Sequence, residues 1–382
     1  MQPHRKGLKM KKYSLAGFRP APITEKEAVA TRRHQGIPGI ERLDSGRLFA
    51  TWYGGELNGE GPGNYLVLAT SRDNGLSWRE IQIVAPDGAE ERAFDPTLWL
   101  DPDGRLWWSW SQCVTTGIWD IFDGRSGVWV AVCDDPDTDS PVWSAPRRIA
   151  EGVMMNKPTA LSDGSWAFPT ALWGIYPDKL DPQYTAIARS NISVTRDKGQ
   201  TFELIVGPDI PNRGFDEHIL LEQRDGVWRI LVRTHYGIGQ AFSDDCGRTW
   251  RDIGDSRLGG PDSRFALRRL KSGKLLLINH QTPIPLPGET PAFQREKLTA
   301  WLSSDDGASW HGRLLLDERP GVSYPDFTEG NDGFLYCVYD RNRCGRGEIL
   351  LARFTEQDVE AGEFITPGGF QRGLISAFPI KK

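Results

Sequence analysis

The octapeptide SSDDGASW at residues 303–310 decides the fold, because the chain carries its pattern four times. The other copies are SRDNGLSW at 71–78, TRDKGQTF at 195–202 and SDDCGRTW at 243–250, and a degenerate fifth copy runs from 133 to 143. In such a turn the aspartate accepts hydrogen bonds, the glycine permits a positive φ, and the aromatic ring covers the edge of a sheet. Each copy therefore predicts a capped β-hairpin with a structural role.

A second repeat indicates how many sheets the chain forms. A D-G or S-G turn followed by a hydrophobic run occurs six times. The turn glycines are Gly46, Gly104, Gly164, Gly226, Gly273 and Gly333. Successive glycines lie 47 to 62 residues apart, which is too long for one hairpin and fits a four-stranded sheet with its loops. We therefore expect six sheets.

The composition is typical of an all-β protein. The 382 residues include 42 Gly and 26 Pro, which turns require, and 15 Trp, which strands favour, but only 4 Met. The net charge of −5 offers no broad cationic surface, so nucleic acid is not expected as a partner. The five cysteines form no CxxC pair, and we expect neither a metal nor another cofactor.

The ends of the chain and its apolar runs suggest its location. The sequence has no 18 consecutive apolar residues, and its basic N-terminus lacks the apolar segment of a signal peptide. These features predict a cytoplasmic protein that does not bind membranes. We expect a basic, disordered segment at 1–12 and a single domain at 13–382, because no linker divides the chain. The sequence carries no signal for an oligomeric state.

Together the two repeats resemble the Asp-box, or BNR, repeats of the sialidase-like six-bladed β-propellers, over roughly residues 30–355. The resemblance implies an all-β fold with six blades. The sixth repeat has no Asp box, so we expect its sheet to be completed by pairing residues 348–354 with the N-terminal segment near 13–18. Such a closure would remove an open sheet edge.

The phase of the repeat predicts a site. In a propeller the first strand of every blade lines the central axis, so equivalent positions gather at one mouth of the funnel. Nine residues before each turn glycine stand Ile37, Asp95, Met155, Glu217, Arg264 and Tyr324. Seven residues after it stand Tyr53, Ser111, Ala171, Arg233, His280 and Asp340. The mixture of carboxylates, guanidinium groups and a tyrosine favours a binding pocket over ordinary solvated strand ends.

The resemblance to sialidases extends to single residues. Their nucleophile is a tyrosine near a late D-G turn, and Tyr324 in the stretch SYPDF is similar. Glu217 in FDEH resembles the glutamate that activates it, and Arg233 in VRT resembles an arginine on the next strand. Arg295 in QREKL is similar to a further arginine. The resemblance implies that Tyr324 is the nucleophile, that Glu217 is its base and that the arginines bind a substrate carboxylate.

The chain also departs from the sialidase pattern. Sialidases have an R-I-P motif, whereas this chain reads G-I-P, with Gly36 in place of the arginine. Arg264 or Arg341 is a candidate replacement. The acid/base aspartate has no clear equivalent, and Glu56 and Glu60 are the candidates for that role. The remaining predicted substrate-binding residues are Asp95, His218, His280 and Asp340.

These residues predict an exo-acting glycosidase that hydrolyses a terminal carboxylated sugar, such as sialic acid or a related ulosonic acid, with retention of configuration. Each guanidinium binds a carboxylate through forked hydrogen bonds, and a neutral tyrosine avoids the repulsion that a carboxylate nucleophile would meet. One alternative is a polysaccharide lyase or uronate-directed glycosidase with Tyr324 or a histidine as base, the histidines being His34, His218, His235 and His280. Another is a non-catalytic carbohydrate-binding propeller that stacks sugars on its tryptophans.

Overall fold

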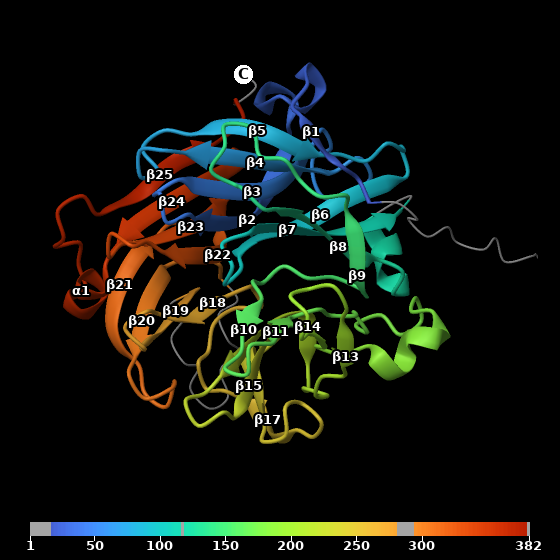
Figure 1. The fold of residues 1–382 in the computed structure, drawn as a ribbon, viewed down its shortest axis with the longest axis vertical. Coiled ribbons are helices and arrows are strands. Elements are labelled where there is room, and N and C mark those ends of the chain that lie inside the picture. Colours follow the sequence, from blue (N-terminus) through green and yellow to red (C-terminus); the bar gives the residue numbers. More distant parts are fainter. Residues whose placement is uncertain (1–16, 116–117, 281–293, 380–382) are drawn as a thin grey trace, which may run out of the picture.

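The strands form six antiparallel sheets around a common axis, in a computed structural model that describes residues 17–115, 118–280 and 294–379 (Figure 1). Within the described ranges each sheet is built from strands that follow one another along the chain, except that the first sheet gains an extra outer strand. The prediction of six sheets is confirmed. The segment 1–12, which we expected to be disordered, lies outside the described residues.

In each sheet four strands follow one another from the axis to the rim. The innermost strands are β2 (His34–Arg42), β6 (Glu91–Leu100), β10 (Thr159–Ala160), β14 (Arg213–Glu222), β18 (Ala266–Arg269) and β22 (Val322–Glu329). The second strands are β3 (Leu48–Gly55), β7 (Leu106–Val114), β11 (Trp166–Phe168), β15 (Trp228–Thr234), β19 (Leu275–His280) and β23 (Leu335–Arg341).

The outer half of each sheet lies at the rim of the molecule. The third strands are β4 (Tyr65–Ser71), β8 (Gly127–Cys133), β12 (Ile192–Thr195), β16 (Gly237–Ser243), β20 (Leu298–Ser303) and β24 (Glu348–Phe354). The outermost strands are β5 (Arg79–Val84), β9 (Arg147–Glu151), β13 (Glu203–Ile205), β17 (Arg251–Asp255), β21 (His311–Asp317) and β25 (Phe370–Ser376), with β1 (Pro20–Pro22) beyond β5. The short helices are η1 (Glu25–Glu27), η2 (Val29–Thr31), η3 (Ile118–Asp123), η4 (Pro182–Ile187) and α1 (Glu356–Ala361).

The octapeptide at 303–310 is the turn between β20 and β21, and its hydrogen bonds are those expected from the sequence. The backbone N–H and the hydroxyl of Ser309 both donate to Asp305, and the N–H of Gly307 donates to Ser303 Oγ over 2.8 Å. Gly307 has a φ of 83°, which a side chain would strain. The Trp310 ring packs against the hydrophobic cluster between neighbouring sheets. The box therefore caps the outer hairpin.

The predicted closure of the sixth sheet is wrong. Its fourth strand is β25, which pairs with β24, whereas the N-terminal strand β1 pairs with β5 in the first sheet. After β24 the chain forms α1, which Thr355 caps through a reciprocal pair of hydrogen bonds with Asp358, and Gly362 ends the helix with a φ of 77°. This compact turn returns the chain beside β24, so the sheet is completed locally and needs no N-terminal strand.

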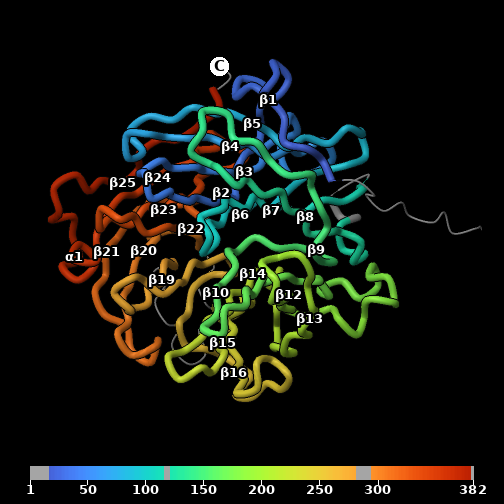
Figure 2. Tube along the Cα trace, viewed as in Figure 1, coloured from blue at the N-terminus to red at the C-terminus, as the bar shows by residue number. Residues whose placement is uncertain are grey.

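The ring is closed by contacts between the first and last sheets. Figure 2 shows the blue β2 beside the red-orange β22 and β23, and these strands are in contact. The N–H of Ile37 donates to Asp340 over 2.7 Å, and the N–H of Ile40 donates to Asp326 over 2.9 Å. On the axis the buried Lys157 ammonium lies 2.7 Å from Glu41 and 3.2 Å from Asp326. Carboxylates of the sixth sheet thus hold the strand that begins the ring.

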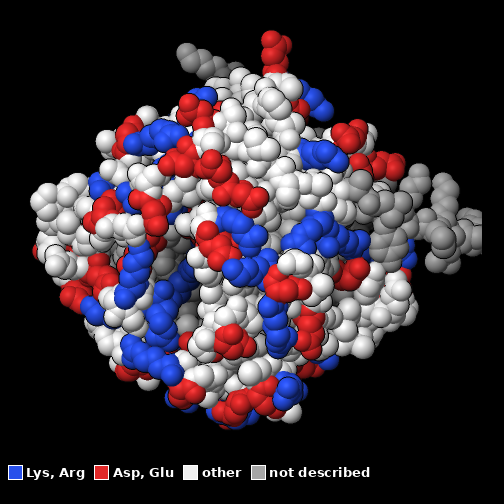
Figure 3. Space-filling model, in the orientation of Figure 1, with Lys and Arg blue, Asp and Glu red and all other residues white. Residues whose placement is uncertain are grey.

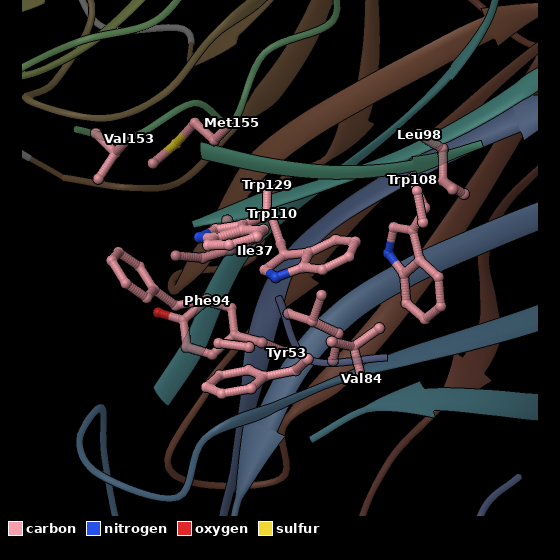
Figure 4. Packing of buried hydrophobic residues seen from close by; sticks show 14 of the residues in the cluster. Ile37, Tyr53, Val84, Phe94, Leu98, Trp108, Trp110, Trp129, Val153 and Met155 are labelled. Atoms are coloured by element: carbon pink, nitrogen blue, oxygen red, sulfur yellow. The ribbon is translucent and has the colours of Figure 1, made fainter. Parts of the chain in front are cut away.

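Apolar side chains fill the spaces between sheets. The largest cluster includes Trp108, Trp110 and Trp129 (Figure 4). It continues to Ile37 and Phe94 near the axis. The surface is of mixed charge, with acidic and basic side chains intermingled on the face drawn in Figure 3. No helix in the described part of the chain is long and apolar enough to cross a bilayer.

The Asp box predicts an acid-sensitive contribution to stability. Hydrogen bonds from the N–H and hydroxyl of Thr249 lower the pKa of Asp245 to about 2, below its ordinary value of 3.8. The stabilisation is therefore present above about pH 4 and is lost as the pH falls toward 2. We expect Asp245→Ala to lower Tm at pH 7 and the difference from wild type to shrink between pH 4 and pH 2, measured by thermal melts. Asp87→Ala, an exposed aspartate, is the control, and an equal loss there would contradict the role of the box.

Candidate active site

Four inner strands carry a β-bulge at the same position. The register shifts occur in β2, β6, β14 and β22 between Gly36 and Gly39, Phe94 and Thr97, Asp216 and Ile219, and Ser323 and Asp326. The bulges hold four side chains in the left-handed region, with φ values from 43° to 57°, at Ile37, Asp95, Glu217 and Tyr324. These are the positions nine residues before a turn glycine. A bulge redirects a side chain out of the alternation of the strand, and here it directs all four toward one cavity.

The cavity has a volume of about 370 Å³ and lies at one mouth of the ring. Its polar lining consists of Glu60, Asp95, Glu217, Arg233, Arg295, Tyr324 and Arg343. Its apolar lining consists of Ile37, Phe94, Ile121, Phe122, Met155, Trp173 and Phe215. Of the six positions nine residues before a turn glycine, five line this cavity, and Arg264 does not.

Tyr324, Glu217 and Arg233 form a closed set of hydrogen bonds inside the cavity. The Tyr324 hydroxyl donates to Glu217 Oε1 over 2.9 Å, and Arg233 Nη1 donates to the same oxygen over 2.6 Å and to the Tyr324 hydroxyl over 3.0 Å. Arg233 Nε donates to Asp262 over 2.5 Å. Burial and the Glu217 charge raise the pKa of Tyr324, although the nearby arginines oppose the shift. The phenol is therefore neutral at rest and has a carboxylate placed to accept its proton.

Two further guanidinium groups face the Tyr324 ring. The Arg295 guanidinium lies 5.2 Å from the ring centroid, and that of Arg343 lies 4.5 Å from it. Arg295 Nη2 donates to the carbonyl of Asp262 over 3.1 Å. Three cationic groups, Arg233 included, therefore surround the tyrosine. Such a set suits an anionic ligand group, such as a carboxylate or a phosphate, which a guanidinium binds through two parallel hydrogen bonds.

Arg343 was missed by the sequence analysis, which considered Arg341 instead. The Arg341 guanidinium lies outside the cavity, where it pairs with Glu348 over 2.9 Å and bonds to the carbonyl of Pro320. Arg343 stands in the turn between β23 and β24, beyond the positions that the repeat relates to one another. The only sequence signal for an arginine from elsewhere was Gly36, which stands where the sialidase motif has an arginine.

The two predicted acid candidates lie in different places. Glu56 is exposed and does not line the cavity, whereas Glu60 does. Burial alone would raise the pKa of Glu60, but Arg92 and Arg343, at 3.4 and 3.5 Å, outweigh it and lower the pKa. Glu60 is therefore ionised.

Asp95 is in the opposite state. It is 3% exposed, and its Oδ2 has no hydrogen-bond partner among the described residues. Burial and the charge of Glu60 raise the pKa of Asp95 well above 3.8. The cavity therefore combines Asp95, whose protonated form burial favours, with Glu217 and Glu60, which accept hydrogen bonds or pair with arginines.

Three predicted substrate-binding residues lie outside the cavity, and each has a hydrogen bond to another part of the protein. Arg264 lies on the ring axis, where its Nε donates to Asn156 and its Nη1 to the carbonyl of Pro38. His218 bonds to the carbonyl of Asn191 and His280 to that of Glu296. Asp340, another predicted site residue, does not line the cavity, but it accepts hydrogen bonds from Ile37 and Ser323 and lies 3.5 Å from Arg343.

The described residues contain no group of three or more His, Cys, Asp or Glu side chains arranged to hold a metal ion.

Six antiparallel sheets with Asp-box hairpins and a polar cavity at the axis define a sialidase-like six-bladed β-propeller. The family model for the BNR repeat-like domain matches residues 46–337, and the chain belongs to this family. No curated protein matches the chain.

Solved structures share the fold at low identity. A Hadza microbial sialidase, Hz136, matches with a TM-score of 0.63 and 20% identity over 81% of this chain and 63% of its own. The intramolecular trans-sialidase from Ruminococcus gnavus, in complex with oseltamivir carboxylate, matches with a TM-score of 0.64 and 12% identity over 91% of this chain and 99% of its own. The Trypanosoma rangeli sialidase matches with a TM-score of 0.61 and 16% identity, and the chain spans 57% of its length.

The buried histidines predict a loss of stability in mild acid. Burial lowers the pKa of His218 and His280 to about 4, whereas an unfolded histidine titrates near 6.5. Stability is therefore complete above pH 6.5 and falls as the unfolded state takes up protons between pH 6.5 and 4. We expect Tm to fall over this range, and to fall less in His280→Asn than in wild type. Thermal melts of both proteins at pH 7.5, 6.0 and 4.5 give the slope of Tm against pH. Equal slopes in wild type and His280→Asn would contradict the role of His280 in this acid sensitivity.

Proposed function

We propose that the protein is an exo-acting glycosidase that hydrolyses the glycosidic bond of a terminal carboxylated sugar, of the sialic acid or ulosonic acid class. The observation that carries the proposal is the Tyr324 hydroxyl donating to Glu217 within a cavity where arginines surround it. A neutral phenol paired with a carboxylate base is an activated nucleophile. Membership of the BNR family and the sialidase-like fold are consistent with this chemistry.

The proposed reaction has two steps. In the first, Tyr324 Oη bonds to the anomeric carbon, its proton passes to Glu217 Oε1, and the glycosidic bond breaks as the leaving oxygen takes a proton from a carboxylic acid of the cavity. In the second, water attacks the anomeric carbon and gives a proton to the carboxylate left behind. The bond between Tyr324 Oη and that carbon breaks, and the tyrosine regains its proton from Glu217. Two displacements at one carbon retain its configuration.

The arginines explain the choice of nucleophile. The carboxylate of the sugar lies next to the reacting carbon. Arg233 and Arg295 would bind this carboxylate and hold it in place while positive charge develops on the sugar ring. A carboxylate nucleophile would be repelled by that group. The neutral phenol of Tyr324 avoids this repulsion until its proton has moved to Glu217.

The protonation states of the cavity favour Asp95 as the proton donor to the leaving oxygen. Asp95 is buried and has no hydrogen-bond partner at Oδ2 among the described residues, so burial raises its pKa and favours its protonated form. Glu60, one of the two candidates named from the sequence, pairs with Arg92 and Arg343, which lower its pKa.

The two alternatives find less support. The lyase alternative loses its histidine bases, because His218 and His280 bond to backbone carbonyls outside the cavity and His235 pairs with Asp262 at 2.7 Å. Of the bases named for it, only Tyr324 lines the cavity. A binding propeller would need exposed aromatic rings. Six of the tryptophans considered for that role are buried and do not line the cavity, namely Trp52, Trp99, Trp107, Trp108, Trp110 and Trp129, whereas Trp173 lines it.

Removing the phenol hydroxyl tests the nucleophile. We expect Tyr324→Phe to reduce release of the fluorophore from an aryl α-sialoside by roughly 10³-fold or more, because no other group stands in its place. Binding of free sialic acid, measured by calorimetry, should persist, since the guanidinium groups are unchanged. Tyr236→Phe, a tyrosine outside the cavity, is the matched control. Equal turnover by Tyr324→Phe and wild type would overturn the proposal.

Leaving-group dependence tests the acid. We expect Asp95→Asn to lose roughly 10²-fold or more on a sialyl-lactose, whose alkoxide leaves poorly, and far less on an aryl sialoside, whose phenoxide needs no proton. Glu60→Gln should affect both substrates to the same degree, because an ionised group donates no proton. If the leaving-group dependence appears in Glu60→Gln instead, Glu60 is the acid and the assignment to Asp95 is wrong.

A further inference from the structure

Arg343 reaches the cavity across the position at which Gly36 has no side chain. A Cβ atom added to Gly36 would lie 2.2 Å from Cδ and 2.4 Å from Cγ of Arg343, and 2.8 Å from Oδ2 of Asp340. Contacts that short do not occur between carbon atoms in folded proteins. Gly36 itself does not have a positive φ, so its backbone conformation would accept any residue. The space taken by Arg343, and not the backbone, requires the glycine.

The Arg343 side chain is held in this position from both ends. Its carbonyl accepts a hydrogen bond from the N–H of Gln35 over 3.1 Å, which joins the turn after β23 to β2. Its guanidinium lies 3.5 Å from Asp340 on one side and 3.5 Å from Glu60 on the other. The side chain is 18% exposed. It is therefore directed into the cavity by two carboxylates, with one edge left to meet a ligand.

We propose that Arg343 is a substrate-binding residue and supplies the third guanidinium of the site. It extends from the last blade into the space that a side chain at residue 36 of the first blade would occupy. Its ligand group is the carboxylate of the sugar, which it shares with Arg233 and Arg295. This inference rests on the proposed function.

The arrangement makes the two positions mutually exclusive. A side chain at 36 and the Arg343 side chain cannot occupy the same volume, so a substitution at Gly36 acts through Arg343. Glu60 and Asp340 serve as positioning residues in this account, because they hold Arg343 and lie on opposite sides of its guanidinium.

The test is a double-mutant cycle on aryl sialoside hydrolysis. We expect Arg343→Ala to lower kcat/KM by roughly 10- to 100-fold, the value of one charged hydrogen-bonding group, and to weaken binding of sialic acid in calorimetry. Gly36→Ala should cause a similar loss by displacing Arg343. The double variant should be no worse than Arg343→Ala, because the two changes remove the same interaction. Additive losses in kcat/KM would contradict the inference that a side chain at residue 36 acts by displacing Arg343.

Two further variants complete the experiment. Arg341→Ala removes the neighbouring arginine that pairs with Glu348 and should leave kcat/KM unchanged. Introducing Gly36→Arg into Arg343→Ala should restore part of the lost binding, which a purely structural role of Arg343 does not predict. An active wild type with unchanged kinetics in Arg343→Ala would overturn this inference alone. A folded wild type that neither cleaves nor binds a carboxylated sugar would overturn the proposed function, and the role of Arg343 with it.

Discussion

The bulge in the inner strands is the constraint on which the site depends. A regular strand directs its side chains alternately to the two faces of a blade, and both faces are buried against neighbouring blades. In four inner strands a break in this alternation directs a side chain into the cavity. At Asp95, Glu217 and Tyr324 the break places a non-glycine residue at positive φ, which costs about 1–3 kcal/mol at each position. The paired strands and capped hairpins on either side hold the backbone in that conformation.

Charge pairing explains how so many ionic groups remain in one buried place. Arg233 lies between Glu217 and Asp262, and Arg343 lies between Asp340 and Glu60. An unpaired guanidinium at such a depth would cost several kcal/mol in lost hydration. Each arginine therefore keeps a carboxylate partner from the protein and retains an edge for a ligand. Burial instead raises the pKa of Asp95, whose Oδ2 has no hydrogen-bond partner among the described residues.

The repeat phase predicted part of this site because each blade keeps a constant number of residues between bulge and turn. That constancy placed Asp95, Glu217 and Tyr324 in the cavity. Arg264 has the same phase but precedes a short inner strand, β18, so it has no bulge to direct it and joins the axial hydrogen bonds instead. The closing strand β25 was missed because its residues are mostly half-exposed and lack a D-G turn, so no repeat marked it.

The sequence by itself determined the number of sheets, the Asp-box turns and the meeting of Tyr324, Glu217 and Arg233 in one cavity. These features depend on hydrogen bonds and spacings within one blade, which a short stretch of chain encodes. Only the tertiary structure decided that Arg343 fills the space beside Gly36, that Arg92 and Arg343 lower the pKa of Glu60 and that burial raises the pKa of Asp95. Those properties arise where the first and last blades meet and where the cavity excludes water, because distance through space and burial, not position along the chain, set the packing and the charge of each group.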